Sequence, residues 1–458
     1  MTYEDKLKYH TLDKNGKPTG VFDERIVQHI LDTQHMFIYA GQPFVYENGF
    51  YKMDMGGRRI QSMIADHIID TFIRSSTVSR IYKRFHQKAE LAKEYDELNA
   101  FPDHWVNFQN GMYDPIRGVL RPHDPKYFCL NQIPHKYDPD ADHGPGDNID
   151  RYLGFITSEE DDRQMLLQYI GLCCTHDISQ QKMLILNGLG GTGKSTLINL
   201  IQEVVGIQNI SNVALTQFES DRFASIDLMG KLMNACADLE IDALDNTSVV
   251  KKLVGDDRVR GQFKGENAVN FMNYAKLLFS TNELPLVRNE KTNGFYRRLL
   301  ILTMNNKPTA VDPKLQSKLK SQLPYLIDLS MKALRDMYAG DGLILNSKAS
   351  LKAVAQLNRD SDTVEAFVQE CCEKCGDNVK SNRIDLYEAY SDFCKDDDRQ
   401  THTRNNFYKA LRNKGFSERR TTAARYFIGI KLADKDHNPA EGFQPAEDFY
   451  TQEIPLDC

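Results

Sequence analysis

The amino-acid sequence predicts an α/β protein organised around a phosphate-binding loop, and three observations indicate this class. A short apolar segment leads into a glycine-rich loop, Gly188–Ser195, and a helical pattern of apolar residues follows it. Two further apolar segments, which end near residues 236 and 279, are each followed by polar side chains. Helical patterns lie on both sides of this block, and a smaller unit rich in basic residues comes after it.

Length and charge limit the remaining possibilities. A chain of 458 residues is too long for one core and suggests two to four domains. The formal net charge of −7 means that any site for a polyanion must be a local basic patch. No apolar run approaches about eighteen residues, and the first residues lack the apolar region of a signal peptide. We therefore expect a cytoplasmic protein with no membrane partner.

Nine cysteines, an odd number, are scattered along the chain. They fit reduced thiols in a cytosol better than a disulfide framework. Cys372 and Cys375 form a CxxC pair, with Cys394 and His402 further on. Because a zinc site needs a second clear pair of ligands, packed helix cysteines are the preferred interpretation.

Residues 1–145 are predicted to form an N-terminal α+β domain. Phe44–Lys52 is expected to be a hairpin with an Asn-Gly turn. A stripe of apolar residues predicts a helix over Arg59–Ile73, and Asn110–Pro125 is expected to be a second hairpin with a Pro/Gly turn. Tyr137–Asp147 consists mostly of Pro, Gly and Asp, which predicts a linker.

Helices are predicted before and after the phosphate loop. Residues 146–180 are expected to form a helical collar that takes part in oligomerisation. Residues 181–340 are expected to form the ATPase domain. Its strands and helices run to about residue 305, and helical sequence continues to about Ala339.

The glycine-rich loop matches the pattern G-x-x-x-x-G-K-[ST] without a mismatch. A triphosphate needs many donors at short range, and glycines let backbone N–H groups surround it next to the positive end of a helix. Lys194 is expected to contact the β- and γ-phosphates of ATP, and Ser195 to bind Mg²⁺. The alternative is a turn that binds nothing, which the register of strand, loop, lysine and helix disfavours. The predicted nucleotide-binding residues are Gly188, Gly190, Gly191, Thr192, Gly193, Lys194, Ser195 and Thr196.

Polar residues downstream could complete an ATPase site. Asp238 and Glu240 follow one apolar segment and could hold Mg²⁺ or polarise water. Asn282 follows the next one and could orient the attacking water. Arg297 and Arg298 come directly before a third apolar segment. Each feature is weak alone, since surface acids, turn asparagines and exposed arginines are common.

In combination, these features resemble superfamily 3 helicases. Within that group the chain looks most like the helicase half of the phage, plasmid and poxvirus primase-helicases. The likeness covers roughly residues 105–305, and the segments NGMYDP and IPHKYDPDAD resemble the approach to the motor in that family. The resemblance implies a core of the AAA+ type with ATP and Mg²⁺ as cofactors. It also implies a homo-hexameric ring that moves 3′→5′ on single-stranded DNA.

The resemblance also implies roles for individual residues. Lys194 and Ser195 would bind nucleotide and Mg²⁺, and Asn282 would be the sensor. Asp238 and Glu240 would form the second acidic motif, with Asp238 as a metal ligand. Asp238 stands where many relatives have glutamate, so which of the two acids activates water stays open. Arg298, or Arg297, would act as an arginine finger in the neighbouring subunit, an effect on the order of 10³ to 10⁵ in rate.

The segment Lys251–Asn273 is expected to be a lysine-bearing hairpin whose tip is Lys264–Asn267. In the family this tip projects into the channel of the ring and contacts DNA. Lys264 is the predicted phosphate contact, with Arg258 and Arg260 near it. The alternative is a solvated charged hairpin, which mixed signs of charge favour when the order of motifs is ignored.

The family often carries a priming polymerase domain upstream, which needs paired carboxylates on a strand. The segment YKMDM offers one acid, so we expect no primase activity in this chain and a separate primase as a possible partner. What residues 1–105 contact is left open.

Residues 362–433 are predicted to be a winged helix that binds DNA. A stripe from Val364 to Cys372 predicts its first helix, Asn405–Arg412 its reading helix, and Arg425–Leu432 its β wing. A protein-contact module with a basic face is the alternative. The predicted DNA contacts are Arg404, Lys409, Arg412, Arg419 and Arg420. Residues 434–458 are expected to be an acidic tail.

The sequence therefore predicts an ATP-dependent hexameric helicase that acts on single-stranded and forked DNA. It would replicate a phage or other mobile element in a bacterial host cell. The alternative from another class is an origin-binding replication initiator whose ATPase controls assembly. A monomeric small-molecule phosphotransferase is a more distant third.

Overall fold

The structure is a computed structural model of the chain. It describes residues 1–433 apart from 145, 238, 240–246, 286, 288–292, 397–400 and 422–423. The chain divides into two compact units, residues 1–285 with 289–354, and residues 286–288 with 355–458. In the described residues, no helix combines the length and the apolar character needed to span a bilayer.

The first unit is built on a five-stranded parallel sheet. Its strand order is β10 (Ile210–Ser211), β11 (Met233–Cys236), β14 (Lys276–Thr281), β9 (Met183–Asn187) and β15 (Leu299–Thr303). All four neighbouring pairs run parallel, with Met183 opposite both Leu277 and Leu299. Both neighbours of β9, β14 and β15, therefore end level with it. The residues that follow β9 and β14 thus lie at the same end of the sheet.

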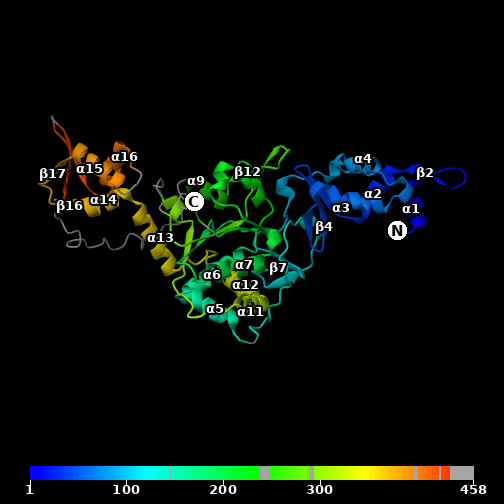
Figure 1. Ribbon diagram of the computed structural model, residues 1–458, viewed down its shortest axis with the longest axis horizontal. Helices are drawn as coiled ribbons and strands as arrows, with labels where there is room; N and C mark the ends of the chain where they lie inside the picture. The colour runs from blue at the N-terminus through cyan, green and yellow to red at the C-terminus, as the bar shows by residue number, and fades with distance from the viewer. Residues whose placement is uncertain are drawn as a thin grey trace. The chain divides into compact units, whose positions relative to one another are not determined.

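Four helices pack on one face of this sheet (Figure 1). The helices are α5 (Asn148–Ile156), α6 (Glu160–Leu172), α7 (Lys194–Val205) and α12 (Leu323–Ala339). They share a core with the alternate sheet residues that point to this face, which include Leu184, Leu186, Leu278, Leu300 and Leu302. This alternation is the expected consequence of the strand pleat. The predicted strand before the loop and the predicted helices around it are confirmed.

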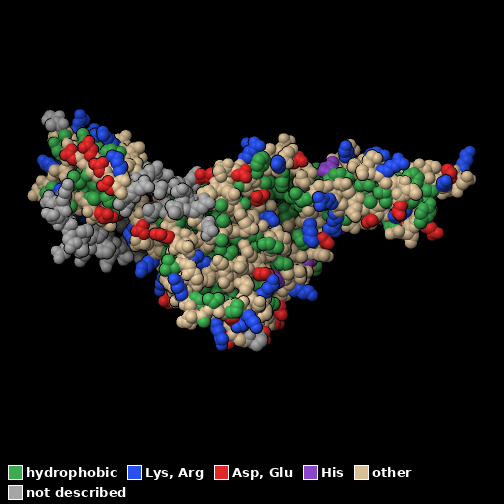
Figure 2. Space-filling model, viewed as in Figure 1, with side chains coloured by type: hydrophobic (Ala, Val, Ile, Leu, Met, Phe, Trp, Pro, Cys, Tyr) green, Lys and Arg blue, Asp and Glu red, His purple; other side chains and the backbone are tan. Residues whose placement is uncertain are grey.

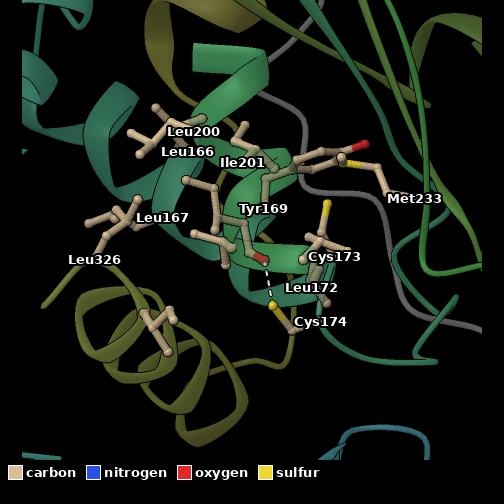
Figure 3. Close-up of a cluster of buried hydrophobic side chains, with 14 of the residues drawn as sticks. Leu166, Leu167, Tyr169, Leu172, Cys173, Cys174, Leu200, Ile201, Met233 and Leu326 are labelled. Atoms are coloured by element: carbon tan, nitrogen blue, oxygen red, sulfur yellow. Dashed lines mark hydrogen bonds between the residues drawn. The ribbon is translucent and has the colours of Figure 1, made fainter. Parts of the chain in front are cut away.

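Helix α6 lies at the centre of this core. Every residue from Met165 to Leu172 is buried, so the helix is covered on all sides. Figure 3 shows its side chains between α7, α12 and Met233 of β11. Tyr169 donates a hydrogen bond to Leu277 O at 2.7 Å, which ties α6 to the sheet. A side chain at Gly171 would meet Ser330 O at 2.8 Å, so this glycine permits the close approach of α12.

The N-terminal part of the first unit has its own small core. Helices α2 (Asp23–Thr33), α3 (Arg58–Asp66) and α4 (Ser75–His86) bury Ile26, Ile64 and Ile81 together. The remaining elements of this part are listed in chain order: α1 (Tyr3–Leu7), β1 (His10–Leu12), β2 (Pro18–Val21), β3 (Met36–Tyr39), β4 (Gln42–Glu47), β5 (Phe50–Met53), η1 (Met55–Gly57), η2 (Asp70–Phe72), η3 (Ala89–Leu91) and η4 (Tyr95–Glu97).

Both predicted hairpins of this region are confirmed. Strands β4 and β5 pair antiparallel across Asn48 and Gly49, whose φ values are 51° and 102°. These left-handed conformations are what the Asn-Gly turn supplies. Strands β7 (Gly111–Asp114) and β8 (Val119–Arg121) form the second hairpin, and β6 (Val106–Phe108) pairs with β7.

The prediction of one helix over Arg59–Ile73 is wrong. Helix α3 ends at Asp66, and a separate 3₁₀ turn, η2, carries Phe72. The chain turns because Ile69 is extended and its N–H donates to His10 Nε2 at 3.3 Å. Ile60, Ile64 and Ile68 are still buried in the same core, with Phe72 packed against it. The apolar spacing therefore identified the core residues correctly, but a contact with a distant strand ends the helix early.

The remaining elements of the first unit lie around the sheet. They are listed in chain order: η5 (Pro125–Tyr127), η6 (Ile207–Asn209), α8 (Gln217–Ser220), η7 (Ala224–Leu228), α9 (Thr247–Val254), β12 (Arg258–Gln262), β13 (Ala268–Met272), α10 (Asn293–Tyr296) and α11 (Leu315–Ser321). Helix α13 (Lys348–Ser361) leads into the second unit.

The second unit packs three helices on two small sheets. Helices α14 (Thr363–Cys371), α15 (Arg383–Asp396) and α16 (Arg404–Asn413) share a core that includes Phe367, Tyr390 and Phe407. One sheet has the order β17 (Lys380–Asn382), β19 (Arg425–Ile428), β18 (Ser417–Arg420), and the other pairs β16 (Cys372–Lys374) with β20 (Ile430–Leu432).

Two details of this unit differ from the prediction. Cys372 belongs to strand β16 and not to the first helix. The predicted wing Arg425–Leu432 is not one hairpin, because β19 pairs with β18 whereas β20 pairs with β16. Gly429, at φ 82°, separates the two strands and redirects the chain from one sheet to the other. The hairpin of this unit is therefore β18–β19.

Candidate functional site

The glycine-rich loop leaves the carboxyl end of β9 and enters α7 within six residues. Gly188 is extended with φ 159°, and a side chain on it would lie 2.2 Å from Met304 O. Gly191 and Gly193 take left-handed conformations at φ 85° and 98°. Thr192 is buried and its hydroxyl donates to Leu189 O at 3.0 Å. The loop is therefore a compact turn that requires glycine at three positions: Gly188 for lack of space, and Gly191 and Gly193 for their left-handed conformations.

Lys194 begins α7 and folds back over the loop. Its ammonium donates to Gly188 O, to Leu189 O at 3.2 Å and to Asn282 Oδ1 at 2.9 Å. Asn282 follows β14, the neighbour of β9, so the parallel register delivers it beside the loop. The structure thus brings together the predicted phosphate lysine and the predicted sensor.

A cavity of about 880 Å³ opens at this loop. It is lined by Arg151, Tyr152 and Phe155 of α5 and by residues of the segment from Pro308 to Lys318. The loop itself forms the floor from Gly190 to Thr196, and Asn282 lies at its side. Gly190 and Gly191 have nothing within 4 Å of a potential side chain, so the cradle is open toward the cavity. This shape and the free backbone fit the triphosphate of a nucleotide.

Tyr152 is a residue of this site that the sequence did not reveal. It comes from α5 and donates to Gly193 O at 3.0 Å, directly at the start of α7. Its ring is buried, and this burial raises the pKa of the phenol, which therefore stays a neutral donor. An aromatic residue on an apolar helix face gives no sign that it will bond to a loop 41 residues later.

The predicted acidic pair, Asp238 and Glu240, lies outside the described residues. Strand β11 ends at Cys236, and its neighbour β14 separates it from β9. Ser280 of β14 donates through its hydroxyl to Ala237 O, which holds the end of β11 to β14. Among the described residues, no group of three or more His, Cys, Asp or Glu side chains is arranged to hold a metal ion.

The two predicted finger arginines lie at the amino-terminal ends of the strands, opposite the end that carries the phosphate loop. Arg297 and Arg298 come directly before β15, whose first residue is opposite Met183 and whose last is opposite Asn187. The strand has five residues, and at about 3.3 Å each they separate the arginines from the loop edge by roughly 16 Å. Arg297 and Arg298 therefore cannot reach the phosphate loop of their own chain.

The arginine edge is locally positive. Both arginines donate to Gln181 Oε1, Arg297 at 3.0 Å and Arg298 at 3.1 Å, and Arg298 also donates to Gly294 O. Lys182 donates to Arg297 O at 2.6 Å. Burial, and then the charge of Arg297, lowers the pKa of Lys182 to about 8. Arg297 is exposed whereas Arg298 is partly buried.

The predicted lysine-bearing hairpin is confirmed as β12–β13. Arg258 is opposite Met272 and Gln262 is opposite Ala268, so residues 263–267 form the tip. Lys264 is exposed there, next to Gly265 at φ 87°. One face of β12 packs on η7, since a side chain at Gly261 would lie 3.0 Å or less from Ile226 atoms. Arg258 and Arg260 alternate onto the exposed face.

The base of this hairpin is attached to η4 of the N-terminal part. Tyr95 donates to Met272 O at 2.6 Å and its ring lies 6.2 Å from that of Phe271. Arg258 donates from Nη2 to both carboxylate oxygens of Asp96, at 2.8 and 2.7 Å. One of the predicted DNA contacts is thus held by a carboxylate of the same chain.

The C-terminal basic residues divide into two groups. Arg412 pairs with Glu418 at 2.5 Å, Lys414 with Asp362 at 2.7 Å, and Lys431 with Glu373 at 2.6 Å. These pairs neutralise part of the charge that the sequence predicts. No carboxylate of the described residues pairs with the other four predicted contacts, which are exposed: Arg404, Lys409, Arg419 and Arg420.

Three family models match parts of the chain. Residues 55–158 match a family described as D5 N terminal like, and residues 359–451 match a family described as Poxvirus D5 protein-like. Residues 186–298, which include the phosphate loop, match a family of unknown function, DUF5906.

A protein of Acanthamoeba polyphaga mimivirus, whose name proposes a helicase, is 27% identical over 212 residues. That match covers 44% of this chain and 22% of the viral protein. Together with the family matches, this relative shows a similarity to D5-like viral proteins and to a protein named as a helicase.

The apo structure of the NrS-1 C-terminal region is similar at a TM-score of 0.49 and 10% identity, over 89% of this chain and 99% of that one. Another apo structure of this region has a TM-score of 0.46 at 11% identity, over 89% and 98%.

Proposed function

We propose that this chain is the ATP-driven motor of a D5-like, superfamily 3 replicative DNA helicase. It would act as a homo-hexameric ring that moves 3′→5′ on single-stranded DNA. The replicon would be a phage or other mobile element in a bacterial cell, and a separate primase would be its partner. The strand order β15-β9-β14-β11-β10 places a strand between the loop strand and the acidic-motif strand, which supports an AAA+ core.

One observation carries the proposal. The phosphate loop with Asn282 and the arginine pair lie at opposite edges of one parallel sheet, roughly 16 Å apart. Each chain therefore holds an incomplete site on one side and cations for another site on the other side. A closed ring of identical chains satisfies this head-to-tail arrangement, because every loop then faces a neighbour's arginines.

ATP and Mg²⁺ fit the residues present. The backbone N–H groups of the loop and the ammonium of Lys194 would hold the phosphates, and Ser195 with Asp238 would hold the metal ion. When bound, the metal ion neutralises the charge that develops on the phosphates. Asn282 already contacts Lys194 and would orient the attacking water, with Glu240 as the other candidate for activating it. Arg297 or Arg298 of the next chain would supply the remaining positive charge.

The β12–β13 hairpin would be the DNA contact. Its tip carries the exposed Lys264, and its base is fixed to the N-terminal part through Tyr95. A hairpin that is attached to the core at its base can transmit movement of the ATPase core to a bound strand. Lys264→Ala is expected to keep most of the ATPase activity yet to lose unwinding of forked DNA. Loss of both activities together would argue against this role.

The ring is tested by mixing chains. Arg298→Ala or Arg297→Ala chains, mixed with wild type, are expected to inhibit unwinding of forked DNA more than in proportion to their fraction, because one disabled site would stall the whole ring on DNA. The matched control is Arg335→Ala, which changes an exposed arginine of α12. Its mixtures with wild type should keep full activity. Inhibition in simple proportion, with a single-chain species under all nucleotide and DNA conditions, would contradict the proposal.

A second candidate is an origin-binding initiator whose ATPase controls assembly. The C-terminal unit favours it, because the order α14, β17, α15, α16, β18, β19 supports a winged helix with α16 as the reading helix. Arg404 and Lys409 lie on α16, and Arg419 and Arg420 lie on β18. Sequence-specific binding of duplex DNA without strand separation would favour this function over the helicase.

A further inference from the structure

Two cavities adjoin each other where the β4–β5 hairpin meets the edge of the sheet. The first, of about 660 Å³, lies between β4–β5, the edge strand β10, η7 and the start of the β12–β13 tip. The second, of about 760 Å³, continues past the β4–β5 turn to His123 and Lys136. Both are lined by Phe50, Lys52 and Gln208, so they share a wall. We call the combined surface the hairpin groove; its key residues are Phe50, Lys52, Lys136, Gln208, Lys231 and Phe263.

The charged lining of the hairpin groove is mostly basic. Lys52, Lys136 and Lys231 line it, and Asp227 is the one carboxylate among its described lining residues. Lys136 is exposed, and no described carboxylate pairs with it. Lys52 contacts Glu47 at 3.0 Å, but Glu47 also pairs with Arg59 at 2.9 Å, so this cluster keeps a positive charge. On a chain with net charge −7, such a groove is a local site for a polyanion.

Aromatic side chains lie between these cations. Phe50 and Phe263 are partly buried, so each ring keeps surface toward the groove. Lys52 Nζ lies 5.1 Å from the centroid of the Phe50 ring. Phe44 and Tyr51 also line the groove and are buried. Basic side chains that follow a backbone, combined with rings on which bases stack, are the pattern of sites for single-stranded nucleic acid.

The hairpin groove also begins where the proposed DNA contact lies. Phe263 directly precedes Lys264, the exposed lysine of the β12–β13 tip. Figure 2 shows Lys and Arg side chains on the face over β12 and along the N-terminal part of this unit. A strand that leaves the tip therefore meets the groove next.

We propose that the hairpin groove binds single-stranded DNA, with its phosphates on Lys52, Lys136 and Lys231 and its bases on Phe50 and Phe263. This inference rests on the proposed function and assigns a role to the N-terminal part. The β4–β5 hairpin then forms one wall of the path of the DNA strand. This part of the path lies beyond the tip of the β12–β13 hairpin, which is proposed to move the DNA.

The test measures binding of fluorescent oligo(dT), about 16 nucleotides long, to the full chain at a series of salt concentrations. Lys136→Gln is expected to weaken binding several-fold and to reduce the slope of log affinity against log salt by about 0.7, the contribution of one phosphate contact. Lys14→Gln, an exposed lysine in the β1–β2 connection, is the matched control and should change neither value.

The substitution Phe50→Leu tests the contribution of base stacking to DNA binding separately from the contribution of charge. It is expected to weaken binding by about five-fold or more without changing the salt slope, because base stacking involves no counterion. Phe22→Leu, at a partly exposed ring before α2, is its control. All variants should unfold at the temperature of the wild type. A benzophenone residue at Gln208 should crosslink to the oligonucleotide, which gives a readout independent of affinity.

Three results would overturn the inference. One is that Lys136→Gln and Phe50→Leu bind as tightly as wild type while Lys264→Ala loses binding; the proposed helicase function would then stand without the groove. Another is a crosslink from Gln208 only to polypeptide, which would assign the groove to a protein partner. The last is that wild type binds no oligo(dT) at any salt concentration, with or without nucleotide, which would overturn the proposed function as well.

Discussion

The phosphate loop and the tip of the β12–β13 hairpin are both tight turns with a lysine beside a glycine, yet they are held in opposite ways. Lys194 is partly buried and donates to two carbonyls and to Asn282. Lys264 is exposed at a tip whose glycine has nothing within 4 Å of a potential side chain. Lys194 is thus fixed by its surroundings, whereas Lys264 projects from the tip of a hairpin that is attached at its base.

This difference matches what each turn has to do. Donors that stabilise developing charge are effective when they are already in place, because no reorganisation is then needed during the reaction. A DNA contact that moves needs a firm base and a clear tip. The base of the hairpin is held by Tyr95 and by the Arg258–Asp96 pair. Four substitutions test this contrast, in order of decreasing effect.

The largest effect is expected from Lys194→Ala. Removing the charged donor of the loop should lower ATP hydrolysis on the order of 10³-fold. Steady-state ATPase kinetics measure it. Lys320→Ala, an exposed lysine of α11 paired with Glu203, is the control. Activity within a factor of about ten of wild type would mean that the loop does not bind the reacting phosphates.

A smaller effect is expected from Tyr152→Phe, which removes only the hydroxyl that donates to Gly193 O. Loss of a neutral hydrogen bond costs about 1 kcal/mol of unfolding free energy. We expect kcat to fall about ten-fold, because the loop loses its fixed position, and KM to change less. Tyr338→Phe, whose hydroxyl donates to Asp177 away from the loop, should lose stability alone. Equal kinetics for the two variants would refute the positioning role of Tyr152.

At the hairpin, Tyr95→Phe should loosen the base without touching the ATP site. The lost bond to Met272 O again costs about 1 kcal/mol. The expected result is an unchanged basal ATPase but a several-fold weaker stimulation by single-stranded DNA. The ratio of the two rates measures it. A parallel loss of basal activity would show that Tyr95 acts on the core and not on the hairpin.

The smallest effect is expected from Asp96→Asn. The Arg258–Asp96 pair is exposed, and such pairs contribute about 0–1 kcal/mol. Removing the carboxylate frees Arg258, so the affinity for single-stranded DNA should rise about two-fold at low salt and return to the wild-type value at high salt. Weaker binding of DNA by this variant would indicate that Asp96 orients Arg258 and does not compete with DNA for it.

The sequence predicted what depends on neighbours along the chain. Strand, loop and helix around Gly188–Ser195 follow from local pattern, and so do the Asn-Gly hairpin and the tip at Lys264. The position of Asn282 beside Lys194 needed only the register of two parallel strands. The order of motifs was therefore enough to predict that Lys194 and Asn282 meet at the carboxyl ends of the strands.

The sequence did not predict contacts between distant segments. Tyr152 and Gly193 are 41 residues apart, and Tyr95 and Met272 are 177 apart. Nothing in either local pattern marks these partners. The same reason explains the early end of α3, where His10 accepts from Ile69 N–H, and the redirected strand after Gly429. A count of charges also could not predict the ion pairs that neutralise Arg412 and Arg258.

The position of Arg297 and Arg298 at the far edge of the sheet has a consequence for enzyme preparations. In the proposed ring, hydrolysis per chain would depend on protein concentration and would vanish when dilution separates neighbours. Two inactive variants, Lys194→Ala and Arg298→Ala, would regain partial ATP hydrolysis when mixed. The Lys194→Ala chain would supply intact arginines to the intact phosphate loop of the Arg298→Ala chain.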